Sequence, residues 1–375
     1  MSDARSGFLK TFGYEPAGVW SAPGRANLIG EHTDYNLGFV LPFGINLRTH
    51  AALALRPGNR CTVASDLDGK TYSFELGERP VGLDWALYPL GVAWAMAEHA
   101  SSGFDCFITS EVPVGAGLSS SAAIECSVAT ALNELWGAGK TGQELALIGQ
   151  LAENEIVGAP TGIMDQTASM LSEPDAAVLI DCKTLETELV PLGLEERGLV
   201  VAVMDTRVAH RHSDGGYRVR REACERGAKV MGKASLRELS VADLGRAEEL
   251  LDEVDFRRVR HIITENQRVL DTVEALKAGD LEALGRLLLE SHASMRDDFE
   301  ISIPELDTAV EVAMKTGAVG SRMTGGGFGG AAIAVIHKDL LGTLAANCKA
   351  EFEARGYAEP RIFAVFPSQG ARRDS

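Results

Sequence analysis

The chain has 375 residues, 45% of them hydrophobic, and carries a formal net charge of −17 at pH 7. This acidic excess excludes nucleic acid and anionic membranes as main partners, because binding to phosphate backbones or lipid headgroups needs clustered Lys and Arg. The length favours two lobes with separate cores, and we expect them to span residues 1–180 and 181–375.

The six cysteines lie far apart without metal-ligand spacing, and the opening residues carry no pattern of a secretory leader. These features indicate reduced thiols and a cytoplasmic location. Every apolar stretch falls short of the roughly 18 residues that a membrane span requires. We expect a monomer or a weak homo-oligomer without a membrane or nucleic-acid partner, and a loose tail at SQGARRDS (368–375).

The predicted elements mix strands and helices along the chain. Residues 17–55 alternate apolar runs with Gly and Pro, which is typical of strands in a mixed sheet. A helix is expected within 85–100 and a strand over 103–113. The next helices are expected over 119–137, with serine caps, and over 143–157, opened by a capping box of Thr141 and Glu144. Beyond them we expect strands over 176–206, mainly helices over 215–296 and a final strand at 361–368.

A Gly-rich turn in PVGAGLSSSAAIE (113–125) joins a predicted strand to a predicted helix. Gly115 and Gly117 let backbone N–H groups approach an anion, and the helix amino terminus adds aligned donors. The three serines offer hydroxyls to phosphate or to a hard cation such as Mg²⁺. A plain turn with one capping serine explains the same residues. A second glycine concentration, TGGGFGG (324–330), indicates backbone that closely approaches a ligand or another loop.

Two further patterns point to binding sites but have simpler explanations. The stretch GAGKTG (137–142) is similar to a nucleotide-binding P-loop, yet the leading Gly of that motif is replaced by Glu134 and the stretch follows a helix. The capping box at Thr141 accounts for it. His210 and His212 have the spacing of a metal-binding pair, but no third ligand is suitably spaced, so a surface loop is favoured.

The acidic residues include a candidate catalytic group. Asp165 stands in the first turn of a helix predicted to begin at Ile163 or Met164, where it is either a partner of the helix dipole or a catalyst. Phosphoryl transfer needs a carboxylate that orients and accepts the proton of the attacking hydroxyl, and a cation that stabilises developing charge. Asp165 and Arg25 meet those needs. Glu153 offers an oxygen ligand to a metal, or is a solvated helix residue.

Three separated segments resemble the motifs of the GHMP small-molecule kinases, and the first resembles the galactokinase signature nearly residue for residue. They are GRANLIGEHTDYNLGFVLP (24–42), PVGAGLSSSAA (113–123) and GSRMTGGGFGGAAIA (320–334). The resemblance extends from about residue 10 to residue 367. It implies an α+β fold, the α/β two-lobed architecture of that family, with a mixed sheet in the N-terminal lobe, an antiparallel sheet in the C-terminal lobe and the active site between them.

The resemblance also implies an activity. It is the ATP-dependent phosphorylation of the anomeric hydroxyl of α-D-galactose to galactose 1-phosphate and ADP, the first committed step of galactose catabolism, with ATP and Mg²⁺ required. Asp165 matches the catalytic aspartate of the family, and Arg25 matches the arginine that holds it ionised and stabilises the transferring phosphoryl group. The matching positions of the sugar pocket are Glu31, His32, Asp34, Gly162 and Tyr217.

For the nucleotide, the resemblance places Trp85 near the adenine. It assigns the phosphate loop to Gly115, Ala116, Gly117, Leu118, Ser119, Ser120 and Ser121, and the magnesium ligands to Ser121 and Glu153.

Two alternatives stay open on the sequence. A sensor that binds galactose and ATP without turnover would keep the same pocket, although such homologues shorten the loop just after the serines. Here that part is intact at Ser121, Ala122 and Ala123. A GHMP kinase for a related sugar would share all three motifs, because sequence alone does not fix which polar groups an epimer would leave unpaired.

Overall fold

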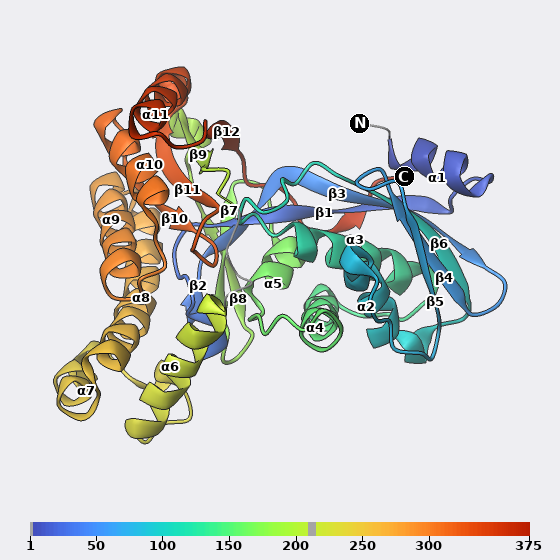
Figure 1. Ribbon diagram of the computed structural model, residues 1–375, viewed down its shortest axis with the longest axis horizontal. Helices are drawn as coiled ribbons and strands as arrows, with labels where there is room; N and C mark the ends of the chain where they lie inside the picture. The colour runs from blue at the N-terminus through green and yellow to red at the C-terminus, as the bar shows by residue number, and fades with distance from the viewer. Residues whose placement is uncertain (1–2, 209–214) are drawn as a thin grey trace.

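The computed structural model describes residues 3–208 and 215–375. The N-terminal lobe is built on a six-stranded sheet in the order β13-β1-β3-β6-β4-β5 (Figure 1). Its neighbouring strands are antiparallel except β4 and β6, which run parallel, so the predicted mixed sheet is confirmed. The strands span Gly18–Asn27 (β1), Pro42–Arg56 (β3), Arg60–Ser65 (β4), Thr71–Glu75 (β5), Gly103–Ser110 (β6) and Arg372–Arg373 (β13).

This sheet separates two hydrophobic cores. In β3, Ala51 and Leu53 belong to one core and Ala52 and Ala54 to the other, because successive side chains of a strand point to opposite faces. The smaller core lies under α1 (Ala4–Phe12). The opposite face carries α2 (Leu87–Ala95), α3 (Ser120–Leu135), α4 (Gly142–Ala152) and α5 (Met164–Leu171), as Figure 1 shows.

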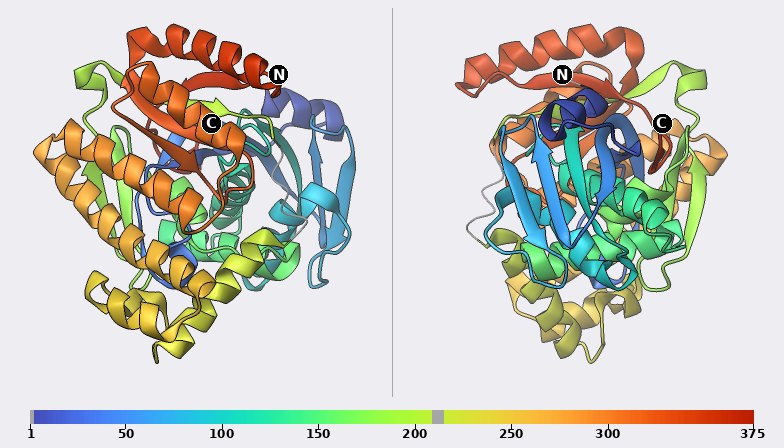
Figure 2. Two further views of the ribbon diagram at one scale, coloured as in Figure 1. Left: turned by 60° about the vertical axis from the view of Figure 1, so that its left-hand side comes forward. Right: turned by 90° about the vertical axis from the view of Figure 1, so that its right-hand side faces the viewer.

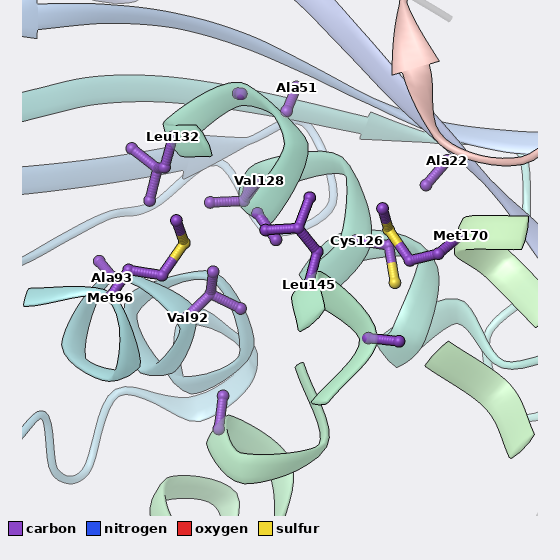
Figure 3. Packing of buried hydrophobic residues seen from close by; sticks show 14 of the residues in the cluster. Ala22, Ala51, Val92, Ala93, Met96, Cys126, Val128, Leu132, Leu145 and Met170 are labelled. Atoms are coloured by element: carbon purple, nitrogen blue, oxygen red, sulfur yellow. The ribbon is translucent and has the colours of Figure 1, made fainter. Parts of the chain in front are cut away.

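Figure 3 shows the larger core from close by. Val128 and Leu132 of α3 lie between Ala51 of the sheet and Val92 of α2. The two α3 residues are one helical turn apart and therefore face the same side of the helix. This packing fixes α3 against the sheet, so the position of its amino-terminal end, where the Gly-rich turn arrives, is fixed as well.

The C-terminal lobe contains a four-stranded antiparallel sheet in the order β10-β11-β9-β12, which confirms the predicted antiparallel sheet. Its strands span Gly320–Thr324 (β10), Ala331–His337 (β11), Leu199–Asp205 (β9) and Arg361–Val365 (β12). Figure 2 shows α8 and α9 running side by side along this lobe. The helices span Gly216–Val230 (α6), Leu244–Leu250 (α7), Glu253–Ala278 (α8), Leu281–Asp297 (α9), Pro304–Lys315 (α10) and Leu341–Arg355 (α11).

The two lobes share one hydrophobic core. Val201 and Val203 of β9 pack there with Leu28 and Phe43, which come from the N-terminal part of the chain. A small third sheet, β2-β7-β8, also joins early and later segments. Its strands span Phe39–Val40 (β2), Ala176–Asp181 (β7) and Thr187–Pro191 (β8). The division of the chain at residue 180 stays a prediction.

The tail at 368–375 is ordered, so the prediction of a loose tail is wrong. In β13, Arg373 pairs with Trp20 of β1. Arg48, only 6% exposed, donates hydrogen bonds of 2.6 and 2.8 Å to the carbonyl oxygens of Gln369 and Gly370. A buried guanidinium needs acceptors for its five N–H groups, and the backbone of the tail supplies two of them.

The helix predicted over 143–157 is divided in two. The capping box of Thr141 and Glu144 is confirmed, and α4 ends at Ala152. The chain then continues as a π-helical turn, η4 (Glu153–Val157), which ends at Gly158 with a φ of 82°. π-Helical turns are rare in proteins overall, but those that occur are often found at functional sites. Within the described residues, no helix combines the length and apolar character needed to cross a bilayer.

Candidate active site

A cleft of about 1280 Å³ brings the predicted site residues together. Ala116 is the exception, because its side chain is buried in the hydrophobic core that the two lobes share. The cleft is lined by Arg25, Glu31, His32, Asp34, Trp85, Gly115, Gly117, Leu118, Ser119, Ser120, Ser121, Glu153, Gly162, Asp165 and Tyr217.

Arg25 and Asp165 form a bidentate pair at this cleft. Arg25 lies on β1 beside a bulge in the pairing with β3, and Asp165 lies in the first turn of α5, as predicted. Nε of Arg25 donates to Oδ1 of Asp165 at 2.8 Å, and Nη2 donates to Oδ2 at 2.9 Å. Nη1 donates to the carbonyl oxygen of Gly117 at 2.5 Å. The arginine therefore connects the carboxylate to the Gly-rich turn.

Ser119 contributes a third donor to Asp165. Its hydroxyl donates to Oδ2, although the sequence predicted a cap for α3 or a phosphate contact. The backbone explains why the capping prediction is wrong. Ser119 has a left-handed conformation with a φ of 55°, and its side chain makes no capping bond to α3. A capping serine normally has an extended backbone, which turns its oxygen toward the helix amides.

The Gly-rich turn meets the second glycine-rich segment. Gly115 and Gly117 have φ angles of 79° and 72°, a region that glycine adopts without strain. A Cβ atom on Gly325 would lie 3.3 Å from the carbonyl oxygen of Gly117. The prediction that residues 324–330 approach another loop closely is therefore confirmed.

Asp34 lies against Gly162 at the predicted sugar end of the cleft. Oδ1 of Asp34 accepts a hydrogen bond of 2.8 Å from the backbone N–H of Tyr35. A Cβ atom on Gly162 would lie only 1.9 Å from Oδ2 of Asp34, so this position requires glycine. Burial raises the pKa of Asp34 to about 6, and the charge of Asp165 adds to the rise.

Glu31 is held by donors from both lobes. Its Oε2 accepts from Asn27 Nδ2 at 2.8 Å and from Arg322, and its Oε1 accepts from the backbone N–H of Gly325 at 2.9 Å. The Thr324 hydroxyl lies 3.2 Å both from Oε1 and from the carbonyl oxygen of Asn27, and it has one proton to share between them. Oε1 is thus the oxygen of Glu31 with remaining capacity to accept a hydrogen bond.

Arg322 and Glu265 extend this buried group. Arg322 of β10 is fully buried, and its Nη2 lies 3.6 Å from Oε1 of Glu265 on α8. The same Oε1 accepts a bond of 3.0 Å from the backbone N–H of Gly30, and Arg268 donates to Oε2 at 2.8 Å. Burial raises the pKa of Glu31, whereas its contact with Arg322 opposes the rise. The signature segment is therefore anchored to the C-terminal lobe through paired charges.

His32 lies beside Tyr217, with 5.0 Å between ring centroids, and has a left-handed φ of 64°. Its Nε2 lies 3.2 Å from the carbonyl oxygen of Gly326, and its Nδ1 lies 2.7 Å from the hydroxyl of Tyr35. A carbonyl oxygen only accepts, so Nε2 is the donor toward Gly326. Through this contact His32 joins the signature to the second glycine-rich segment.

Glu153 stands at the start of the π-helical turn. Its Oε2 accepts from the hydroxyl of Thr161 at 2.9 Å and from Nε2 of Gln166 at 2.7 Å. Burial raises the pKa of Glu153, the charge of Asp165 adds to the rise, and a hydrogen bond from Ser121 opposes it. Within the described residues, no group of three or more His, Cys, Asp or Glu side chains is arranged to hold a metal ion.

Trp85 also lines the cleft and lies in the short helix η2 (Asp84–Ala86). Its indole N–H donates to Oδ2 of Asp68 at 3.0 Å, and the hydroxyl of Tyr72 donates to the same oxygen at 2.8 Å. Leu67 and Val114 complete an apolar rim, 61% and 71% exposed. A flat, apolar ligand group fits such surroundings better than a sugar does.

The structure tests one of the two minor sequence patterns, GAGKTG and the pair of His210 and His212. Thr141 in GAGKTG caps α4, which confirms the capping explanation over a P-loop. His210 and His212 lie outside the described residues.

Four further residues of the site were not predicted. Gln166 and Arg322 contact predicted site residues, and Glu265 contacts Arg322, across long separations in sequence that only the fold closes. Tyr35 contacts His32 three residues away, and the spacing within the signature could have indicated it.

Comparisons with known proteins agree with this geometry. Residues 6–55 match the galactokinase galactose-binding signature, residues 88–173 the N-terminal domain of GHMP kinases and residues 272–354 their C-terminal domain. A galactokinase of Streptomyces coelicolor is 47% identical over 373 residues, which cover 98% of this chain and 96% of that protein. A galactokinase of Streptomyces lividans is 42% identical over 375 residues, which cover 98% and 94%.

Solved structures give the same result. The crystal structure of Lactococcus lactis galactokinase complexed with galactose has a TM-score of 0.93 and 33% identity, and the match covers 98% of both chains. A mevalonate kinase structure, with a TM-score of 0.67 and 18% identity over 94% of this chain and 99% of that one, shares the fold. The chain matches the galactokinase signature and both GHMP domains, and it is 47% and 42% identical to two galactokinases over 98% of its length. It therefore belongs to the galactokinase family of the GHMP kinases.

Proposed function

We propose that this protein transfers the γ-phosphoryl group of ATP to the anomeric hydroxyl of galactose and releases galactose 1-phosphate and ADP. One observation carries the proposal: Arg25 binds Asp165 with two N–H groups and the Gly-rich turn with a third. A carboxylate and an anion-binding loop thereby face one cleft, as phosphoryl transfer to a hydroxyl requires. Membership of the galactokinase family supports galactose as the acceptor.

Asp165 is the proposed proton acceptor. Two N–H donors of Arg25 and the hydroxyl of Ser119 hold both of its oxygens in place at the cleft. The carboxylate orients the sugar hydroxyl and takes its proton as the bond to phosphorus forms. A loose transition state demands little deprotonation beforehand, so orientation is a large part of this role. Arg25 remains next to the transferring group and stabilises its charge.

The sugar is proposed to lie between Asp34 and Tyr217. Asp34 accepts hydrogen bonds from sugar hydroxyls, and the backbone of Gly162 lies close enough to add a contact. His32 and Oε1 of Glu31 border the same space. Polar groups of this kind discriminate strongly between epimers, because a hydroxyl in the wrong orientation leaves a buried acceptor unpaired.

ATP is proposed to extend from the Gly-rich turn toward Trp85. Backbone N–H groups of residues 115–121 and the amino terminus of α3 receive the phosphates, and the apolar rim around Trp85 receives the adenine. Ser121 and Glu153 are the proposed ligands of Mg²⁺, an ion that takes one or two protein oxygens together with water and phosphate oxygens. When bound, Mg²⁺ neutralises charge on the β- and γ-phosphates. The adjacent carboxylates of Glu153 and Asp165 suit such a cation.

A coupled assay for ADP release, run with galactose, 2-deoxygalactose, talose, arabinose, glucose and N-acetylgalactosamine, tests the proposal. We expect turnover with galactose and much lower kcat/KM with glucose. Binding of galactose and ATP without ADP release contradicts the proposal and identifies a sensor. A higher kcat/KM for arabinose or N-acetylgalactosamine identifies a kinase for a related sugar. The cytoplasmic location and the monomeric or weakly oligomeric state stay predictions.

A further inference from the structure

A buried pair beneath the cleft has no role in the mechanism described above. Glu125 lies on α3, one turn after Ser121, and Gln166 lies on α5, next to Asp165. Both side chains are fully buried. Nε2 of Gln166 donates to Oε2 of Glu125 at 2.9 Å and to Oε2 of Glu153 at 2.7 Å. One amide group thus uses both of its protons on two carboxyl groups.

The remaining oxygens of this pair are unsatisfied. Oε1 of Glu125 and Oε1 of Gln166 are both buried, and neither has a hydrogen-bond partner in residues 3–208 and 215–375. Both atoms are acceptors, so a proton on Oε1 of Glu125 gives each of them a partner. Burial raises the pKa of Glu125 well above its ordinary value, and the charge of Glu153 adds to the rise. A neutral carboxylic acid that pairs with an amide through two hydrogen bonds satisfies every atom.

The orientation of the Gln166 amide decides whether the Glu153 carboxylate faces an N–H group or an oxygen. With the orientation described here, Gln166 presents N–H to Glu153, whereas the flipped amide would present oxygen to a carboxylate and repel it. A neutral acid at Glu125 can pair with the amide through two hydrogen bonds and so hold its plane, while the Glu153 carboxylate, which accepts from Nε2, selects the orientation that turns N–H toward it. Thr161 and Gln166 both meet Glu153 at Oε2. Oε1 of Glu153 is therefore the oxygen turned to other partners.

We propose that Glu125 is a positioning residue, which fixes the amide plane of Gln166 so that Gln166 aims the Glu153 carboxylate at the cation accompanying ATP. The inference rests on the proposed function, in which Glu153 holds that cation. Gly149 of α4 completes the arrangement, because a Cβ atom there would lie 3.0 Å from Cγ of Gln166 and 3.5 Å from Oε2 of Glu125. Three helices thereby converge on one amide group.

The test compares Glu125→Gln with Glu125→Leu in the full chain. Glutamine reproduces the neutral acid, because its amide both accepts and donates, whereas leucine does neither. Mn²⁺ binding is measured by electron paramagnetic resonance in the presence of a non-hydrolysable ATP analogue, and galactose affinity by calorimetry. We expect about tenfold weaker Mn²⁺ binding in Glu125→Leu, in line with the loss of a partner behind a metal ligand. The galactose affinity of both variants should stay within about threefold of wild type, and so should the Mn²⁺ affinity of Glu125→Gln.

Two results would overturn the proposal. If Glu125→Gln binds Mn²⁺ as weakly as Glu125→Leu, the charge of Glu125 matters and the residue acts on the cation itself. If Glu125→Leu binds Mn²⁺ like wild type, Glu125 positions nothing. A wild-type chain without galactose-dependent ADP release contradicts the proposed function instead, so the two failures are separable.

Controls separate positioning from loss of packing. Leu132→Ala removes a fully buried side chain from the same helix and should lower Tm without changing Mn²⁺ affinity. If Glu125→Leu does not fold, Gly149→Ala provides the second variant, because alanine favours the helix while its Cβ displaces the amide of Gln166. Several-fold weaker Mn²⁺ binding in Gly149→Ala supports the proposal, and wild-type binding in that variant contradicts it.

Discussion

The guanidinium of Arg25 binds both carboxylate oxygens of Asp165 while its third nitrogen binds the carbonyl oxygen of Gly117. A planar donor group of this kind fixes the distance between the carboxylate and the Gly-rich turn, which lysine, a single point charge, would not do. The proposed base and the proposed phosphate loop therefore form one rigid unit.

Replacement of Asp165 should separate catalysis from binding. In Asp165→Asn we expect kcat to fall about 10²- to 10⁴-fold, the usual contribution of a positioned proton acceptor. Galactose affinity, measured by calorimetry, should stay within about tenfold, because the residue acts mainly in the transition state. Asp271→Asn, on the exposed side of α8, makes the same chemical change elsewhere and should keep wild-type kcat. Wild-type kcat in Asp165→Asn contradicts the assignment.

Removal of the Ser119 hydroxyl should slow the reaction without disturbing the helix. Ser119→Ala deletes one donor to Asp165, and hydrogen bonds to charged groups contribute about 1.5–3 kcal/mol. We expect kcat to fall about tenfold or more, as measured in the coupled assay. Ser127→Ala is the matched control, because that hydroxyl bonds only a backbone carbonyl of its own helix, at Ile124. Equal kcat values for the two variants would rule out a role for Ser119 at Asp165.

A methyl group at position 162 should impair the sugar end alone. Gly162→Ala places a Cβ atom against Oδ2 of Asp34, so the carboxylate has to move. We expect the KM for galactose to rise about tenfold or more, whereas the KM for ATP stays within about twofold, since removing substrate contacts acts on that substrate's binding. Gly245→Ala adds a methyl where no atom lies within 4 Å and should change neither constant. A parallel rise in both KM values would indicate general misfolding instead.

The pKa of Asp34 predicts a pH dependence with a definite sign. The folded-state pKa of about 6 lies above the ordinary value of 3.8, so the folded state holds its proton at pH values where the unfolded state has lost it. The contribution of Asp34 to the free energy of unfolding is therefore present below about pH 4 and declines as pH rises to 6, by about 3 kcal/mol.

Asp34→Asn should remove that decline. Urea unfolding of wild type and variant at pH 4.5 and 7 gives the change in the free energy of unfolding between the two pH values. The contributions of the other carboxyl groups to this change are the same in the two proteins and cancel. Galactose affinity should follow the opposite course in wild type, rising through pH 6 as the ionised Asp34 becomes a better acceptor. A galactose affinity that is constant from pH 5 to 7 would show that the charge of Asp34 takes no part in binding.

The position of α3 and the start of α4 were predicted correctly, because each depends on a short pattern of neighbouring residues. The stripe of Val128 and Leu132 identified α3, and the pattern of Thr141 and Glu144 identified the start of α4. The resemblance to a family selected residues from distant segments, and the fold brings all of them except Ala116 to one cleft. Their chemical roles stay proposals.

The features that escaped prediction depend on tertiary contacts. Ser119 is a good capping residue by type, but its left-handed backbone and the nearby Asp165 redirect its hydroxyl. The tail was expected to be loose, yet its carbonyl groups accept hydrogen bonds from the buried Arg48, which lies 321 and 322 positions earlier than the two acceptors. No periodicity within a segment carries information on partners so far away.

The buried charges of Glu31, Arg322 and Glu265 also limit how the molecule can move. Removing one partner of a buried ion pair typically costs about 3–5 kcal/mol, and the pair of Glu31 with Arg322 holds the two lobes together beside the proposed sugar residues. Leu67 and Val114, which line the part of the cleft proposed for the nucleotide, are by contrast largely exposed. In the proposed function, the nucleotide therefore enters and leaves without breaking the buried charge pairs beside the sugar residues.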